Sequence, residues 1–499
     1  MNQTPAYDAL RARRLQIYNL EAVQAIASWD RMTFMPAGSG SARAAAQAEL
    51  AALIQTLQTS EELDGLAARA ASEPLNANDR TNLKLMERER LVAAAVPEAL
   101  NTRRSHAVAA ASDAWRQARA ANDWALFSGP LSTLVEVVRE SAQRLGDALG
   151  LSRYDALLDG HDRGLNRAQV EQWFGEIGQW LPGIVASITA QQAAEEVLIP
   201  QGPFPQEGQR QACLAAMTAL GFDFERGRLD VSAHPFTGGT PDDVRLTTRY
   251  TEDECLSALL GVIHEAGHGR YQAGLPGTWR GQPLGEPCSA SMHEAQALAF
   301  ERQLALSPAF VQVLSEILQT HLGPQPAFEP RILHRLMTRV RPGAIRVDAD
   351  EVTYPAHVIL RTEIEIALIE GEIEAGDVPA LWDQRMLDLL GVDVRGNPAQ
   401  GPLQDIHWSL GMFGYFPAYL IGAMAAAQLF QSFTASTGAA ALDQSSGTEL
   451  SRALGEWLED KVWRHGAAMT TGDLIASATG QPLSPTALKD HFQRRYAGA

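Results

Sequence analysis

Apolar residues recur at steps of three and four residues along most of this 499-residue chain. This spacing places them on one face of an α-helix, and breaks such as Met35-Pro36 and Pro74-Leu75 separate the periodic runs. Clear examples are Leu50, Leu53, Ile54 and Leu57, and Leu131, Leu134, Val137 and Val138. Alternating strand and helix patterns do not occur, which excludes a parallel α/β sheet. The sequence therefore predicts a mainly α fold, with residues 1–200 as a helical scaffold.

One short region departs from the helical pattern. Apolar and polar residues alternate there as they do in a half-buried strand. The alternating apolar residues are Leu229, Val231, Ala233, Val244 and Leu246. We interpret residues 234–239 as a turn and predict a small sheet of two or three strands. The helical pattern resumes from Asp253.

Residues 406–442 contain no Asp, Glu, Lys or Arg, and residues 414–430 are largely apolar. A membrane-spanning helix needs about 20 consecutive apolar residues. Gly414, Pro417 and Gln428 interrupt this run. The stretch therefore predicts a buried helix and no membrane partner.

The overall charge and the cysteines limit the possible partners and location. The 41 basic and 59 acidic residues give a net charge of −18, which repels phosphate backbones and predicts no nucleic-acid partner. The three cysteines, Cys213, Cys255 and Cys288, form no disulfide framework or CxxC motif. Because the first 20 residues also lack a secretory pattern, we expect a cytoplasmic location. We interpret the charged turn at residues 159–164 as a solvated loop.

The motif His264-Glu265-Ala266-Gly267-His268 lies in a run with a helical pattern, residues 255–271. Residues four apart share one face of a helix, so both imidazoles can bind a single cation. A zinc ion at a catalytic site takes three protein ligands and keeps a fourth position open. The motif therefore predicts two ligands of a zinc site.

The third ligand must come from a following segment. The metzincin spacing is excluded, because its third histidine would fall on Gly274 and its glycine on Tyr271. The next helix begins near Ser289 and carries Glu294, and the intervening loop is rich in Pro and Gly. We predict that Glu294 is the third protein ligand of the zinc site.

This combination favours peptide hydrolysis. Zn²⁺ polarises a carbonyl group and acidifies a water molecule, while Glu265 accepts its proton as the general base. A donor must also face the oxyanion of the tetrahedral intermediate. The candidates of suitable type are His234, His407, Tyr415 and Tyr419, and the sequence does not rank them.

Together these motifs resemble the carboxypeptidase Taq family of metallocarboxypeptidases. The matching segments are HEAGH (264–268), HEAQA (293–297), HPF (234–236), DVRLT (243–247), IRVDAD (345–350) and GPLQDIHW (401–408). The match covers the whole chain, so we predict one domain over residues 1–499, with the catalytic part at 225–430. The resemblance implies a deep groove, a small sheet beside the HExxH helix, a homodimer, and removal of C-terminal residues with zinc or cobalt.

Carried over residue by residue, the resemblance implies metal binding by His264, His268 and Glu294, and general-base catalysis by Glu265. Ala295 departs from the family, which usually has Ser after the ligand Glu.

An exopeptidase must recognise a free carboxylate, and a bidentate guanidinium group is suited to this task. We predict Arg346 for this role, with His234 and Tyr419 as further substrate contacts. For Arg245 we expect an ion pair with Asp243, although Asp243 can alternatively support a ligand imidazole. We expect His293 and His357 to pack in the core or behind the ligands, and Cys288 to be structural.

The sequence thus predicts a cytoplasmic metallocarboxypeptidase acting on peptides with a free C-terminus. One alternative is a zinc oligopeptidase that cleaves internally. Against a thermolysin-like site, Leu298 stands where an Asp would follow the ligand Glu. The other alternative is a peptide-binding protein with a structural metal, although structural sites usually fill four protein ligands.

Overall fold

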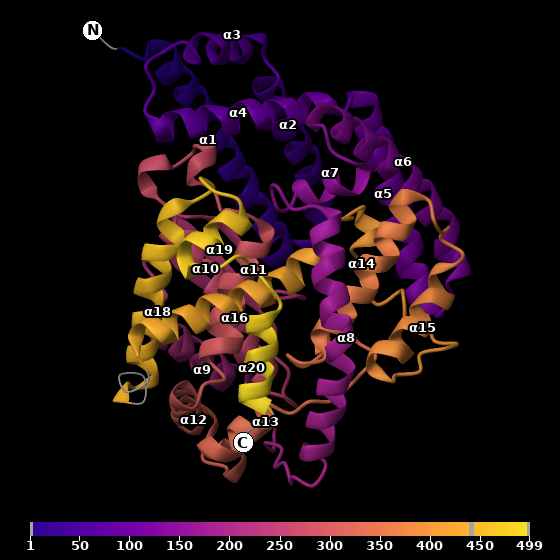
Figure 1. Ribbon diagram of the computed structural model, residues 1–499, viewed down its shortest axis with the longest axis vertical. Coiled ribbons are helices and arrows are strands. Elements are labelled where there is room, and N and C mark those ends of the chain that lie inside the picture. The colour runs from indigo at the N-terminus through magenta and orange to yellow at the C-terminus, as the bar shows by residue number, and fades with distance from the viewer. Residues whose placement is uncertain (1–2, 439–443, 497–499) are drawn as a thin grey trace.

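The computed structural model describes residues 3–438 and 444–496 (Figure 1). Its helices confirm the mainly α prediction. In the first part of the chain they are α1 (Pro5–Thr33), α2 (Gly40–Gln58), α3 (Glu61–Ala70), α4 (Ala77–Ala95), α5 (Glu98–Ala121), α6 (Ala125–Leu149), α7 (Arg153–Asp159), α8 (Arg167–Gln192) and α9 (Gln206–Ala219). After the sheet follow α10 (Leu256–Gly274), α11 (Ala290–Leu298), α12 (Pro308–Leu322), α13 (Pro330–Met337), α14 (Tyr354–Glu370), α15 (Val378–Leu390), α16 (Pro417–Thr437), α18 (Gly447–Lys461), α19 (Thr471–Thr479) and α20 (Thr486–Tyr496).

The N-terminal helices pack around their own small core. Buried residues of α1, α2, α3 and α4, among them Leu10, Ile54, Leu63 and Met86, form a cluster separate from the main core. These helices lie at one end of the molecule in Figure 1. The main core runs from Leu100 to Tyr496 and joins the remaining helices.

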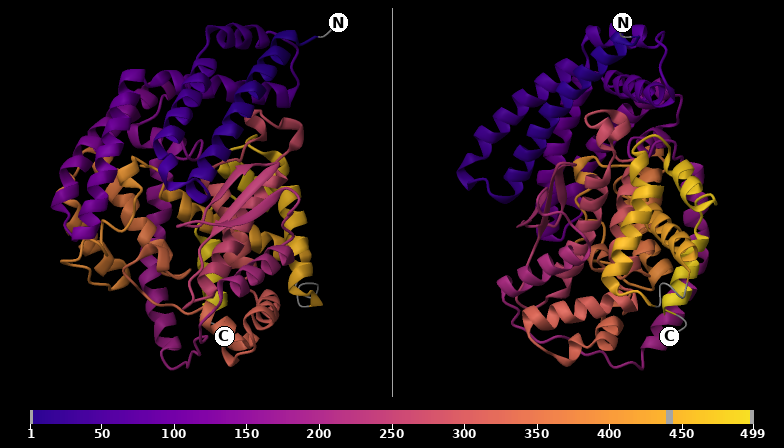
Figure 2. Two further views of the ribbon diagram at one scale, coloured as in Figure 1. Left: turned by 180° about the vertical axis from the view of Figure 1, so that it is seen from behind. Right: turned by 90° about the vertical axis from the view of Figure 1, so that its left-hand side faces the viewer.

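The small sheet has the strand order β1-β3-β2, with β1 at Gly227–Val231, β2 at Thr237–Thr240 and β3 at Asp243–Thr248. Strand β1 pairs parallel with β3, and β2 pairs antiparallel with β3. The prediction of a turn over 234–239 was therefore wrong for its second half, which forms β2. That strand reads TGGT and carries no apolar alternation for a sequence pattern to reveal. Strand β3 packs against α10, and Figure 2 shows the sheet beside the N-terminal helices.

Helix α16 confirms the buried helix predicted from the uncharged stretch, and it packs closely against α11. Along most of its length its residues are buried, including Ile421, Met424 and Ala425. Residues 439–442 of that stretch lie outside the described part of the chain. None of the described helices is long and apolar enough to span a bilayer.

Candidate metal centre and peptide groove

Helix α10 presents His264 and His268 on one face, as their spacing predicts. Their ring centroids lie 4.8 Å apart with the ring planes nearly perpendicular. Glu294 enters from α11, which begins at the side-chain cap Ser289 as expected. Its Oε2 lies 4.0 Å from Nε2 of His264 and 3.8 Å from Nε2 of His268. One ligand atom from each of the three residues lies within 4.8 Å of the others, so the three can share one cation.

Two glycines allow these helices to approach closely. A Cβ atom at Gly267 would lie 2.7 Å from Cα of Ala297 on α11. A Cβ atom at Gly422 of α16 would lie 2.7 Å from both Cβ and Cγ of Glu294. The absence of side chains at these two positions therefore determines how near Glu294 comes to the histidines.

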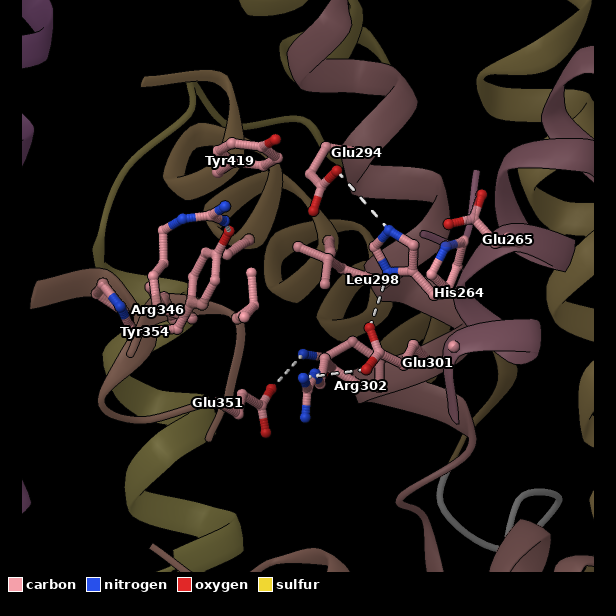
Figure 3. Close-up of a pocket in the computed structure, with 18 residues that line it drawn as sticks. His264, Glu265, Glu294, Leu298, Glu301, Arg302, Arg346, Glu351, Tyr354 and Tyr419 are labelled. Atoms are coloured by element: carbon pink, nitrogen blue, oxygen red, sulfur yellow. Dashed lines mark hydrogen bonds and ion pairs between the residues drawn. The ribbon is translucent and has the colours of Figure 1, made fainter. Parts of the chain in front are cut away.

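The other ring nitrogens of the two histidines are held by the protein. Nδ1 of His264 lies 2.8 Å from Oε2 of Glu301, and Figure 3 shows the ring between Glu294 and Glu301. Nδ1 of His268 lies 3.0 Å from the carbonyl oxygen of His293. Such partners fix the ring orientation and leave Nε2 free for a cation. The expected ion pair of Arg245 with Asp243 is confirmed at 2.7 Å. The alternative role of Asp243 as support for a ligand imidazole was wrong, because Glu301 and the His293 carbonyl oxygen hold the two rings.

The electrostatics of the centre favour a bound cation. Burial raises the pKa of Glu294 to about 7. Burial lowers the pKa of His264, yet the carboxylates of Glu294, Glu301 and Glu265 outweigh this effect and raise it to about 10. The cluster thus attracts positive charge, which matches a divalent ion bound by two imidazoles and a carboxylate.

Glu265 lies beside the ligand cluster and is held by the sheet. Its Oε2 accepts a hydrogen bond of 2.5 Å from Oγ1 of Thr237, which also donates to the Glu265 carbonyl oxygen. Burial raises the pKa of the Glu265 carboxyl group. A buried carboxylate with a raised pKa suits a general base that works near neutral pH. Strand β2 therefore helps to position the candidate base.

The cluster lies where two cavities meet. A cavity of about 380 Å³ extends to one side, and one of about 760 Å³ to the other. Both are lined by Pro235, His264, Glu265, Glu294 and Tyr419. A peptide passing from one cavity to the other would place one of its bonds at the ligand cluster.

Arg346 lines the smaller cavity and is held rigidly. Its Nε and Nη2 donate to Oδ1 of Asp405 at 3.0 and 2.8 Å, and its Nη1 donates to Tyr354 at 2.7 Å. Arg361 donates to the other oxygen of Asp405 at 2.7 Å. Although burial opposes ionisation of Asp405, the two guanidinium groups hold its pKa well below the usual range. The two arginines share one carboxylate, so positive charge remains at the cavity wall.

The aromatic candidates gather above the cluster. Tyr419 lines both cavities, and its hydroxyl oxygen lies 3.2 Å from Nε2 of His407. Tyr415 lines the larger cavity and stacks on His407. His234 is exposed and lies outside the lining of both cavities, whereas its neighbour Pro235 lines both. His357 is fully buried in α14, consistent with packing.

The turn at residues 159–164 is not the solvated loop that we predicted. Asp162 is 2% exposed, and Thr471 donates to its Oδ1 at 2.7 Å. The carbonyl oxygen of His161 accepts from the backbone of Ala290 at the start of α11. His161 and Arg163 line the larger cavity. The loop therefore forms a groove wall and anchors the helix that carries Glu294.

A helical fold with two imidazoles, a carboxylate and an adjacent buried Glu along a groove defines the HExxH class of metallopeptidases. Comparisons with known proteins specify the family. A family model described as carboxypeptidase Taq (M32) metallopeptidase matches residues 9–496. The chain belongs to this family and is a metal-dependent carboxypeptidase.

The similarity to individual relatives extends over the full length. The chain is 31% identical to thermostable carboxypeptidase 1 of Thermus thermophilus, covering 100% of this chain and 99% of the relative. It is 32% identical to carboxypeptidase 1 of Bacillus subtilis, covering 97% and 96%. The structure of Trypanosoma cruzi metallocarboxypeptidase 1 matches with a TM-score of 0.96 and 38% identity, covering 99% of each chain.

Several residues of the site escaped the sequence reasoning. Glu301 lies seven residues after Glu294, nearly two helical turns, which is a spacing that could have indicated it. Asp405 lies within the GPLQDIHW segment, but its pairing with two arginines depends on tertiary contacts. No sequence pattern indicated that Thr237 contacts Glu265, because Thr237 lies in the strand that we predicted to be a turn.

Proposed function

We propose that the carboxypeptidase activity uses His264, His268 and Glu294 as metal ligands, Glu265 as the general base and Arg346 as the anchor for the substrate C-terminus. The observation that carries this proposal is the position of the ligand cluster between the two cavities, with Arg346 in the smaller one. The last residue of a peptide then occupies the smaller cavity, and the preceding residues occupy the larger. One residue is released at each cleavage.

The donor set of two imidazoles and one carboxylate suits Zn²⁺, and Co²⁺ is a second candidate. When bound, such a cation polarises the scissile carbonyl group and acidifies a water molecule. Glu301 and the His293 carbonyl oxygen keep both histidines oriented toward the cation. This orienting role is supported because both contacts are made to Nδ1, so that Nε2 of each histidine stays free for the cation.

Glu265 removes a proton from the attacking water and passes it to the leaving amine. The hydrogen bond from Thr237 orients its carboxylate while the second oxygen stays available. The raised pKa of the buried carboxyl group lets it hold the proton between the two steps.

Arg346 binds the substrate carboxylate through the N–H groups that Asp405 and Tyr354 leave free. Asp405 holds the guanidinium in place, so little side-chain entropy is lost on binding. We prefer Tyr419 as the hydrogen-bond donor to the oxyanion, because it lines both cavities beside the ligand cluster. Tyr415 and His407 remain candidates for the same role. A contact from His234 remains a prediction, limited to the exposed edge beside Pro235.

In this proposal residues 1–499 act as one metallocarboxypeptidase domain, with the scaffold at 1–200 and the catalytic part at 225–430. The partners are peptides with a free C-terminus and a second copy of the chain in a homodimer. The location is the cytoplasm, which the three buried, unpaired cysteines support.

The test compares a peptide with its C-terminally amidated twin, with and without a chelator, by time-resolved mass spectrometry. We expect stepwise loss of C-terminal residues from the free peptide alone, and loss of this activity on chelation. Equal cleavage of the amidated peptide would contradict the role of Arg346 and favour internal cleavage. Binding without cleavage by the metal-loaded protein would favour the peptide-binding alternative.

A further inference from the structure

The lining of the smaller cavity includes a second guanidinium group, which has unused hydrogen-bonding capacity. Arg302 lies in the π-helical turn Ala299–Leu304 that continues α11, and it lines this cavity. Its Nη2 lies 3.0 Å from Oε1 of Glu301. Among the described residues it makes no other hydrogen bond or ion pair through its side chain, which is 24% exposed. Most of its N–H groups therefore remain available to a ligand.

The two carboxylates in the same part of the cavity are already engaged. Glu301 holds His264 as well as Arg302, and its side chain is 8% exposed. Glu351, which Figure 3 shows near Arg302, is 7% exposed and accepts hydrogen bonds from several groups. Its donors are His491 at 2.7 Å, Tyr496 at 2.7 Å, Arg495 at 3.3 Å and Gln303 at 3.5 Å. Both carboxylates are thus already engaged by cationic or hydrogen-bonding partners, whereas Arg302 keeps most of its N–H groups unused.

The cavity that Arg346 and Arg302 both line also has apolar walls. They are formed by Leu298, Val347, Pro355, Ala423, Ala426 and Leu488. Such walls pack against the methylene groups of a side chain and leave its polar end to meet the guanidinium. A side chain that enters this cavity thus needs an apolar stem and an acceptor at its tip.

We propose that Arg302 selects C-terminal residues whose side chains end in a carboxylate, with glutamate as the best fit. The proposal rests on the function proposed above, in which Arg346 holds the main-chain carboxylate in this cavity. The guanidinium has five N–H donors in a fixed fork, so it can keep Glu301 and bind a second carboxylate. Glu351 already pairs with Arg495, and Glu301 already accepts a hydrogen bond from His264, so neither carboxylate is an unpartnered acceptor facing the ligand.

The test uses N-blocked dipeptides that share one N-terminal part and end in Glu, Gln, Leu or Arg. For the zinc-loaded wild-type enzyme we expect kcat/KM for the Glu substrate to exceed that for the isosteric Gln substrate by about tenfold. Arg302→Gln should reduce this Glu/Gln ratio to near one, and Arg302→Lys should retain part of it. The matched control Arg335→Gln removes an exposed arginine of α13 and should leave the ratio within about twofold.

Two results would overturn the proposal. One is a wild-type preference for the Arg substrate over the Glu substrate. The other is an equal loss for all four substrates in Arg302→Gln, which would mean that Arg302 acts on His264 through Glu301 instead. Arg346→Lys separates this proposal from the underlying function, because it should raise KM for all four substrates while preserving the Glu/Gln ratio. If Arg346→Lys changes no KM value, the smaller cavity is not the site of the C-terminal residue and both proposals fail.

Discussion

The carboxylate of Glu301 lies 2.8 Å from Nδ1 of His264, on the side of the ring opposite Glu294. This contact makes Glu301 a positioning residue for a proposed metal ligand, because it fixes which nitrogen of His264 faces the candidate metal site. Glu301 also forms an ion pair with Arg302, which lines the smaller cavity. The same carboxylate therefore contacts both the candidate metal centre and the wall of this cavity.

Replacement of Glu301 by Gln should weaken metal binding. The amide removes the negative charge behind His264, and loss of such a partner typically costs about 10- to 100-fold in metal affinity. Competition with a fluorescent zinc chelator measures the dissociation constant. The control Glu316→Gln removes an exposed carboxylate on α12 and should leave the constant unchanged. An unaltered affinity in Glu301→Gln would show that His264 is oriented without this contact.

Replacement of Glu265 by Gln should abolish most turnover and leave the metal site filled. The amide cannot accept the proton of the attacking water, so we expect kcat to fall by about 10²- to 10⁴-fold. Metal content by atomic absorption and the circular dichroism spectrum should match the wild type. If kcat stays within a few-fold of the wild-type value, another group serves as the base.

Replacement of Arg346 by Lys should affect binding more than turnover. Lysine keeps the charge but loses the fork that engages Asp405 and a substrate carboxylate together, so we expect KM to rise by about tenfold or more. Steady-state kinetics with a free-acid peptide measure this change. Arg395→Lys, at a side chain that is 70% exposed, is the matched control. A selective fall in kcat would instead place Arg346 in the chemical step.

Replacement of Gly422 by Ala should push α16 away from α11. The new methyl group would lie 2.7 Å from Glu294, and such overpacking typically costs about 1–3 kcal/mol. We expect both a lower melting temperature and weaker zinc binding. Gly175→Ala on α8 meets nothing within 4 Å and should stabilise the helix by up to about 1 kcal/mol. Equal melting temperatures and zinc affinities in Gly422→Ala and Gly175→Ala would contradict a steric clash between the new methyl group and Glu294.

The buried Glu365 should make stability fall as pH rises. Burial raises its pKa from 4.5 to about 7, despite hydrogen bonds from Tyr154, Trp408 and Gly414. The folded state then binds this proton more tightly than the unfolded state, so its contribution declines from about pH 4.5 to pH 7 and stays low above that range. Between pH 5 and pH 8, the free energy of unfolding of the wild type, measured with urea, should fall by about 2 kcal/mol relative to that of Glu365→Gln. A difference that does not change with pH would show that Glu365 keeps its ordinary pKa.

The sequence predicted those parts of the site that depend on local spacing. His264 and His268 share a helix face at any HExxH motif, and Ser289 marks the start of the next helix. Arg346 could be proposed because an exopeptidase needs a guanidinium group. Its setting between Asp405 and Tyr354 could not be foreseen, because Asp405 lies 59 residues further along the chain.

The failures have a common physical cause. Asp162 looked like part of an exposed turn, but its partner Thr471 lies 309 residues away. Strand β2 was missed because its glycines carry no pattern, and its register is set by pairing with β3. For Asp162 and for β2, a tertiary or strand-pairing contact that the local pattern does not show determines the structure.

The close contact between Gly422 and Glu294 also bears on the timing of biosynthesis. A ribosome releases the chain from its N-terminus, so His264, His268 and Glu294 emerge well before α16. The wall that holds Glu294 at its ligand distance is absent until residue 422 and its neighbours have emerged. A nascent chain therefore carries all three proposed ligands before the helix that packs against Glu294 has emerged.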